Sequence, residues 1–346
     1  MHTSEWLKLQ YPSELNWLGF FPGVAIFFVT SGFLVAGSYI QNDRNLWSYF
    51  RNRALRIYPA LWVNFFVIVL MLVIAGVLTW ESLTGRWFAT YLLTMIPTAS
   101  TLLTAHTVPL QGFHWNEAVP FFPGGALWTI PVELSFYLVL PAVLMFKRPV
   151  FSVVCVALIS LAFAMWYGAK VGPLWTATCA PYLWIFLLGT LARLAWPIIE
   201  VAFNGTFLVW AAILIAYCHT FNTVPDYQSP TPVNVLALIL LAAATLSFAY
   251  TLPKLSSVLK RVDISYGTYL YHMPIIMIFM WCGFVGETWM WPAVFVATAV
   301  VATLSWVFVE KPALTLKKRG SREDARSLPV DRVRPASINS GVAPRS

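Results

Sequence analysis

The sequence has few charged residues. Only 10% of its 346 residues are Asp, Glu, Lys or Arg, whereas 59% are hydrophobic, and the mean hydropathy is +0.71. About a quarter of the residues in soluble domains are charged, so this composition excludes an ordinary soluble protein and indicates that lipid is the main solvent. The 17 Trp and 25 Phe residues agree with this interpretation, because aromatic side chains fill helix interfaces and Trp anchors helices at the headgroup level.

Cysteine is also scarce. The four cysteines show no CxxC pair and no metal-like spacing, so the sequence offers no ligand set for a metal. We expect them to be small packing residues: Cys155, Cys179, Cys218 and Cys282.

The net charge of +8 does not indicate nucleic-acid binding, because the basic residues collect in short connecting segments and in the tail after Pro312. That distribution is typical of membrane topology.

Apolar runs long enough to cross about 30 Å of hydrocarbon predict an all-α, polytopic membrane protein with nine spans. These runs are 18–40, 58–79, 127–146, 149–169, 175–196, 202–219, 233–252, 265–284 and 290–310. A further stretch, 87–105, contains Pro97 and many Thr and Ser residues, so it is a span, a re-entrant segment or an interfacial helix. No cleavable signal peptide is visible, since the first apolar run follows a polar start.

Charge distribution decides between these topologies. If 87–105 does not cross, one side receives only Lys8, Arg86 and Lys170. The other side then receives the basic tail together with Arg44, Arg51, Arg53, Arg56, Lys147, Arg148, Arg193, Lys254, Lys260, Arg261 and Lys311. The positive-inside bias therefore predicts nine spans in the cytoplasmic membrane, with the C-terminus in the cytoplasm and Met1 outside.

Two segments outside the spans complete the domain organisation. Residues 80–126 become a long external loop, and loops of that length are usually functional. Residues 1–314 form the predicted membrane domain, and residues 315–346 form a disordered, basic cytoplasmic tail that can rest on anionic lipid.

One acidic residue, Glu133, lies well inside an apolar helix, in ALWTIPVELSFYLVLP. A carboxylate within a span is costly and by default indicates function. Tyr137 lies four residues later on the same helical face, so a Glu–Tyr pair is suited to bind or activate a hydroxyl. The structural alternative is a protonated Glu133 that bonds a neighbouring helix.

Three arginines precede the second span, in SYFRNRALRIYPALW. Arg53 and Arg56 are three residues apart, so both guanidinium groups project from one face of a predicted helix start, at the cytoplasmic entrance of the span that begins near Tyr58. Paired planar donors at a helix N-terminus suit phosphate. The alternative is an ordinary positive-inside anchor, of which Arg51 would also be part.

Five sequence blocks together resemble the acyltransferase 3 family of membrane acyltransferases. In order they are FFPGVAIFFVTSGFLVAGSY, FRNRALRIYPAL, ALWTIPVELSFYLVLP, ISYGTYLYHMPI and WVFVEKPAL, and they extend from residue 19 to residue 314. The resemblance implies transfer of an acyl group, usually acetyl, from cytoplasmic acyl-CoA to a hydroxyl of a carbohydrate or glycolipid acceptor. It implies membrane lipid as surroundings, no nucleic acid, and no metal.

The resemblance also implies roles for particular residues. Arg53 and Arg56 match the family's RxxR motif, which would bind the CoA phosphates, and Glu133 matches the Glu of its WxxxVE block. Tyr271 and His272 match its LYH block as substrate-binding or structural residues. From the residues alone, a histidine just before Pro274 in a span is more often a packing or network residue than a catalyst.

The chain departs from the family pattern at its start. Relatives begin with a helix that delivers a histidine, thought to be the catalytic base, and His2 stands 21 residues before Gly23, near where that histidine would lie. We therefore expect ten spans in the family core, an upstream helix of about 15–30 residues, and His2 as the base. The alternative is an arbitrary residue beside the start codon, and His106 and His114 are weaker candidates for the same task.

The predicted function is thus acyl-CoA-dependent O-acylation of carbohydrate, with His2, Glu133 and Tyr137 as catalytic residues. Two alternatives stay open. One is a transporter or flippase of lipid-linked sugar, which predicts no CoA dependence. The other is an inactive, truncated family member.

Overall fold

The computed structural model describes residues 19–76, 84, 124–167, 178–228, 230–251, 263–284 and 289–316. Within these ranges the regular structure is helical and contains no strand, so the predicted all-α class is confirmed. Several predicted features lie outside the described residues: His2, segment 87–105, His106, His114 and the tail from residue 317.

The helices follow the predicted apolar runs. They are α2 (Gly23–Gln41), α3 (Leu46–Ile74), the 3₁₀-helix η2 (Gly125–Trp128), α7 (Thr129–Leu144), α8 (Pro149–Tyr167), α10 (Leu183–Phe203), α11 (Phe207–Thr220), α12 (Pro232–Thr251), α14 (Ser265–Trp281), α15 (Met290–Ser305) and the π-helix η4 (Trp306–Glu310). Each of the nine predicted spans overlaps one of these helices or a continuous pair of them. Seven described stretches are long and apolar enough to cross a bilayer, whereas α11, with 14 residues, and α14, with 17, are shorter.

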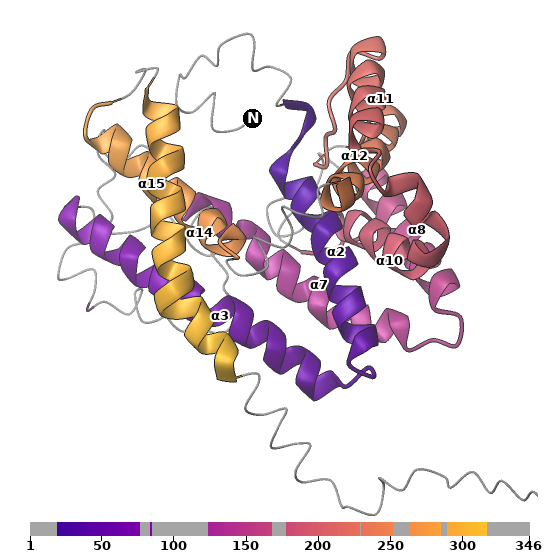
Figure 1. The fold of residues 1–346 in the computed structure, drawn as a ribbon, viewed down its shortest axis with the longest axis horizontal. Coiled ribbons are helices and arrows are strands. Elements are labelled where there is room, and N and C mark those ends of the chain that lie inside the picture. The colour runs from indigo at the N-terminus through magenta and orange to yellow at the C-terminus, as the bar shows by residue number, and fades with distance from the viewer. Residues whose placement is uncertain are drawn as a thin grey trace, which may run out of the picture.

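The helices form two groups. Figure 1 shows α2, α8, α10, α11 and α12 gathered on one side of the molecule and α3, α14 and α15 on the other, with α7 between them. The tightest pair is α2 and α10. A Cβ atom added at Gly32 would lie 1.9 Å from the carbonyl oxygen of Phe186, and one added at Gly189 would lie 2.0 Å from that of Val29. These two glycines therefore let the two backbones touch, as small residues do between membrane helices.

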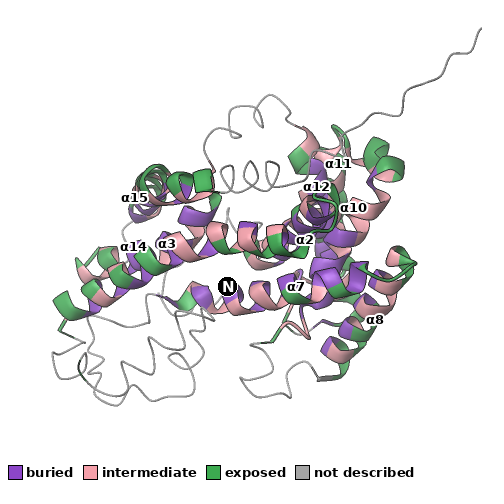
Figure 2. Cartoon of the chain, turned by 90° about the horizontal axis from the view of Figure 1, so that it is seen from below, coloured by how far each residue is buried: buried purple, intermediate pink, exposed green. Residues whose placement is uncertain are grey.

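The outer surface of the bundle is apolar. In Figure 2 the exposed residues, in green, lie mainly on the outward faces of the helices, and the buried residues, in purple, face neighbouring helices. Large hydrophobic side chains dominate the outward faces; Ile198 and Val201, for example, are 84% and 87% exposed. A soluble protein rarely exposes so much contiguous apolar surface. The fold is that of a multi-pass membrane protein.

Helix α3 begins earlier than the hydropathy pattern predicts. The predicted helix start at Arg53 and Arg56 is wrong, because α3 starts at Leu46, where the side chain of Asn45 accepts a 2.9 Å hydrogen bond from the Ser48 backbone N–H. Capping, rather than hydropathy, sets this boundary. Arg53 and Arg56 consequently lie in the second and third turns of α3, and the helix-dipole part of their predicted role is also wrong, since that effect fades after the first turn.

The connections before α3 and after α7 lie at the same end of the bundle. Arg44, in the turn between α2 and α3, donates a 3.3 Å hydrogen bond from Nη1 to the backbone oxygen of Leu144, the last residue of α7. At the opposite end of α7, the ring of Trp128 stacks on that of Tyr227, with centroids 6.5 Å apart. The loop containing Lys147 and Arg148 is thus on the same side as Arg44, as the nine-span topology requires.

The prediction that the four cysteines are small packing residues is confirmed only in part. Cys218 is buried, and Cys155 and Cys179 are partly buried. The prediction of a packing role is wrong for Cys282, which is exposed because it occupies the C-terminal cap of α14 rather than the helix body.

Candidate active site

Glu133 is buried where α7 passes α2. Its side chain is only 5% exposed, and its Oε1 accepts a 3.2 Å hydrogen bond from the Ser31 hydroxyl of α2 and a second hydrogen bond from the Tyr137 hydroxyl. The predicted pairing of Glu133 with Tyr137 at i and i+4 is therefore present in the structure. The bond from Ser31 also links α7 to α2, so the alternative interpretation, in which Glu133 bonds a neighbouring helix, agrees with the structure as well.

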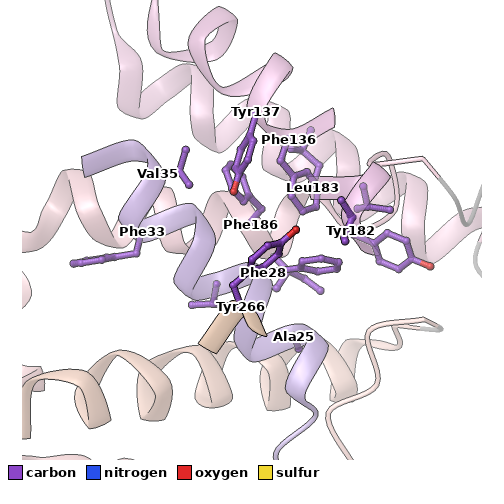
Figure 3. Close-up of a cluster of buried hydrophobic side chains, with 14 of the residues drawn as sticks. Ala25, Phe28, Phe33, Val35, Phe136, Tyr137, Tyr182, Leu183, Phe186 and Tyr266 are labelled. Atoms are coloured by element: carbon purple, nitrogen blue, oxygen red, sulfur yellow. The ribbon is translucent and has the colours of Figure 1, made fainter. Parts of the chain in front are cut away.

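Aromatic side chains enclose this pair. Figure 3 shows Tyr137 and Phe136 projecting from α7 into the buried cluster, which also contains Phe28 and Phe186. The ring of Phe136 stacks on Phe186 at 4.6 Å and meets the edge of Phe28 at 5.1 Å. Polar interactions are strengthened in such surroundings because little water competes for them.

The two arginines of α3 lie beside the Glu–Tyr pair. The Cζ atom of Arg53 is 5.6 Å from the centroid of the Tyr137 ring, within cation–π range. Arg56 and Arg53 both interact electrostatically with Glu133. Two motifs about 80 residues apart in the sequence thus form one cluster, in which α7 supplies a carboxyl and a phenol and α3 supplies two guanidinium groups.

Arg56 also has an acidic partner that the sequence did not suggest. Its Nη2 atom lies 3.0 Å from Oδ2 of Asp263, just before α14, and the two side chains are 39% and 37% exposed. Burial raises the pKa of the Asp263 carboxyl, but Arg56 and the hydrogen bonds from Ser265 lower it by a larger amount. The resulting pKa is below its ordinary value. Asp263 is ionised at neutral pH and holds one side of the Arg56 guanidinium.

Tyr271 and His272 do not join this cluster. Tyr271 is buried and interacts with Ser305, the last residue of α15, and with Glu310, the last residue of η4. The Nδ1 atom of His272 lies 2.8 Å from the backbone oxygen of Tyr269, which requires Nδ1 to carry a proton and makes Nε2 the basic nitrogen of the neutral ring. Among the described residues, no contact joins His272 to Glu133.

Sequence reasoning overlooked several polar residues near the site. Ser31 stands in the VTSGF segment, Asp263 comes two residues before Ser265 at the start of α14, and Glu310 is buried and accepts a 3.1 Å hydrogen bond from Ser305. Glu310 escaped notice because it lies at the polar end of an apolar run. Within the described ranges, no three His, Cys, Asp or Glu residues are grouped as a metal site would need.

The fold and this cluster define a class: a multi-pass membrane protein with a buried carboxyl and two arginines between its helices. Comparison with known proteins makes the class specific. The model of the acyltransferase domain of the acyltransferase 3 family matches residues 1–310, and this chain belongs to that family. The protein is therefore a membrane-bound acyltransferase, as the five sequence blocks predicted.

Three relatives illustrate the family. Nodulation protein 10 of Rhizobium leguminosarum bv. viciae is 37% identical over 337 residues, which cover 91% of this chain and 89% of that protein. The peptidoglycan O-acetyltransferase OatA of Listeria monocytogenes is 25% identical, with 90% of this chain and 54% of that protein covered. The putative peptidoglycan O-acetyltransferase YrhL of Bacillus subtilis is 23% identical, with 98% and 57% covered, so the chain spans just over half the length of these two. No solved structure matches the chain.

Proposed function

We propose that this protein transfers an acyl group, in the simplest case acetyl, from acyl-CoA to a hydroxyl of a carbohydrate-containing acceptor. The observation that supports this proposal most is the juxtaposition of Arg53 and Arg56 with the Glu133–Tyr137 pair. Such a cluster offers donors for an anionic co-substrate next to a pair of groups suited to bind a hydroxyl.

The two guanidinium groups suit the phosphates of CoA. Arginine binds phosphate through parallel N–H donors, with better geometric match than lysine. Asp263 engages Nη2 of Arg56, and that contact fixes the orientation of the guanidinium while its other N–H groups remain for a ligand. In the topology predicted from charge, these arginines are reached from the cytoplasm, where acyl-CoA is found.

The proposed reaction is an ester exchange. The acceptor oxygen attacks the thioester carbonyl, a C–O ester bond forms, the C–S bond breaks, and the hydroxyl proton passes through a base to the departing CoA thiolate. We assign the base to His2, which lies outside the described residues, and we assign to Glu133 and Tyr137 the orientation of the hydroxyl or of that base.

The acceptor class rests on the relatives. Two of them carry the name peptidoglycan O-acetyltransferase, which identifies a carbohydrate polymer as their acceptor. We infer a carbohydrate or glycolipid acceptor here, approached from the outer side of the cytoplasmic membrane, with the C-terminus in the cytoplasm.

Direct binding of labelled acetyl-CoA to the purified protein in lipid nanodiscs tests the donor. We expect Arg53→Ala and Arg56→Ala to weaken binding and Arg148→Ala to leave it unchanged, because Arg148 is an exposed arginine between α7 and α8. If all three variants bind acetyl-CoA as tightly as the unchanged protein, the donor site is wrong and the alternative function, transport of lipid-linked sugar, is favoured.

A further inference from the structure

One face of α3 carries four polar residues in succession. Tyr49, Asn52, Arg53 and Arg56 stand at positions i, i+3, i+4 and i+7, so they form a single stripe along the helix. We refer to these four residues as the polar stripe of α3. The stripe faces α7: the ring of Tyr49 lies 6.4 Å from that of Tyr137, and Arg53 lies over the same Tyr137 ring.

Three atoms of the polar stripe are buried without a hydrogen-bond partner among the described residues. They are the Tyr49 hydroxyl, Oδ1 of Asn52 and Nε of Arg53, and the side chains of Tyr49 and Asn52 are only 3% and 7% exposed. Buried polar atoms are almost always paired, since loss of water otherwise costs free energy. Three such atoms within little more than one helical turn indicate a place where a ligand supplies the partners.

Several polar groups of the neighbouring helices are satisfied. Glu133 has two donors, the Tyr266 hydroxyl donates a 3.0 Å hydrogen bond to the backbone oxygen of Ile57, and Tyr269 bonds to Thr129 and Ala126. Other buried atoms without a partner occur in the described part of the chain, such as Oδ1 of Asn64 and Nε1 of Trp184. The polar stripe differs from these single positions because three such atoms lie within little more than one helical turn, beside the two arginines.

The three atoms specify the chemistry of their ligand. Arg53 Nε can only donate a hydrogen bond, Asn52 Oδ1 can only accept one, and the Tyr49 hydroxyl can do either. A fully ionised phosphate offers acceptors alone, so it satisfies Arg53 and Tyr49 but not Asn52. A secondary amide offers a carbonyl and an N–H together. Acyl-CoA has both features, because an arm with two amides joins its phosphates to the thioester.

We propose that Tyr49 and Asn52 complete the donor site by hydrogen bonding the amide-bearing arm of acyl-CoA. This inference rests on the proposed function, because it takes Arg53 and Arg56 as the phosphate-binding residues. It adds two binding residues and places part of the arm against the N-terminal end of the polar stripe, next to Arg53 and the Tyr137 ring.

The test compares two ligands on matched variants. CoA carries the arm, whereas adenosine 3′,5′-bisphosphate keeps nucleotide phosphates and lacks it. Tyr49→Phe removes only the hydroxyl, and we expect it to weaken CoA binding by about 3- to 10-fold, the value of one hydrogen bond, without changing affinity for the bisphosphate. Asn52→Leu should behave in the same way. Arg56→Ala should weaken both ligands.

Tyr58→Phe is the control, because Tyr58 stands nine residues after Tyr49 and thus about 180° around the same helix. Its affinity for CoA should equal that of the unchanged protein. Thermal melting without ligand supplies a second readout: Tyr49→Phe should keep or raise the melting temperature, since the hydroxyl has no partner to lose among the described residues. A lower melting temperature with unchanged CoA affinity would overturn the inference.

The failures are distinguishable. If Arg56→Ala weakens CoA binding while Tyr49→Phe matches Tyr58→Phe, the inference is wrong and the proposed function stands. If Tyr49→Phe weakens both ligands equally, the hydroxyl contacts phosphate and the assignment to the arm is wrong. If none of the variants changes CoA affinity, the donor site itself is wrong.

Discussion

Tyr137 connects the two halves of the site: its hydroxyl donates a hydrogen bond to the carboxyl group of Glu133, one turn earlier on α7, and its ring lies beneath the guanidinium of Arg53 on α3. This one side chain thus contacts the proposed acceptor-activating group and the proposed donor-binding group. A change at Tyr137 should affect both steps of the reaction, whereas changes at its neighbours should separate them.

The first prediction separates chemistry from donor binding at Glu133. Glu133→Gln keeps the shape and the hydrogen bonds from Ser31 and Tyr137 but removes the titratable carboxyl group. We expect the rate of acyl transfer to fall about 100-fold or more, the usual contribution of an acid–base group, with acyl-CoA affinity nearly unchanged. Steady-state transfer of labelled acetyl, together with a separate binding measurement, checks this.

Serine variants give that prediction a matched pair. Ser31→Ala removes a donor to Glu133, whereas Ser135→Ala removes a hydroxyl whose 2.9 Å bond goes to the backbone oxygen of Pro131 on its own helix. Only Ser31→Ala should slow transfer. Equal rates in both variants would show that the Ser31 bond has no part in catalysis.

The second prediction concerns the two arginines. Each Arg→Ala change, at Arg53 or at Arg56, should weaken acyl-CoA binding by about 1.5–3 kcal/mol, the typical value of a charge-assisted hydrogen bond. Arg→Lys should restore only part of the affinity, because an ammonium cannot reproduce the planar arrangement of donors. Full rescue by lysine in an equilibrium binding assay would show that the site recognises charge alone.

The sequence predicts contacts within a helix better than contacts between helices. The Glu133–Tyr137 pair and the shared face of Arg53 and Arg56 follow from helical spacing alone. The partners Ser31 and Asp263 are 102 and 207 residues away from Glu133 and Arg56 in the chain. Their positions depend on how α2, α7, α3 and α14 pack, which no local pattern records.

Hydropathy has a similar limit at helix ends. It detects where a chain enters hydrocarbon, so it started the second span near Tyr58, whereas the backbone becomes helical at Leu46 because Asn45 caps it. The polar stripe of α3 falls in the interval between the two positions. The helical arrangement of Tyr49 and Asn52 was therefore invisible to a search for apolar runs.

The third prediction tests the contact between α2 and α10. In Gly32→Ala the new Cβ would lie 1.9 Å from a carbonyl oxygen of α10, so the helices must separate. We expect a loss of stability of at least about 1–3 kcal/mol, the usual effect of overpacking. Gly23→Ala is the control on the same helix, because an added Cβ there has nothing within 4 Å. Melting followed by size-exclusion chromatography distinguishes the two; equal melting temperatures would contradict the close packing.

The fourth prediction concerns the pH dependence of the Arg56–Asp263 pair. Because the pKa of Asp263 is lower in the folded protein than its ordinary value of 3.8, the pair stabilises the fold above that value and is lost as the pH falls through the folded pKa. The difference in melting temperature between the unchanged protein and Asp263→Asn should therefore be constant from pH 7 to about pH 5. It should disappear only below pH 3.8. A difference that fades between pH 7 and pH 5 would show that Asp263 is not held ionised by Arg56.

The last prediction tests which ends of the helices face the cytoplasm. Arg44 bonds the C-terminal end of α7, and Trp128 at the other end of α7 stacks on Tyr227, so Lys147 and Tyr227 lie at opposite ends of a helix about 24 Å long. Because basic residues collect at the Arg44 end, we expect that end to be cytoplasmic.

Cysteine labelling tests this orientation. A single cysteine at position 147 should be labelled by a membrane-impermeant maleimide in inside-out vesicles, and a single cysteine at position 227 should be labelled in intact cells. Cys282 must first be replaced by Ser, since it is exposed in the native protein and would react itself. Labelling of position 147 from intact cells, with none at 227, would reverse the proposed orientation and place Arg53 and Arg56 beyond the reach of cytoplasmic acyl-CoA.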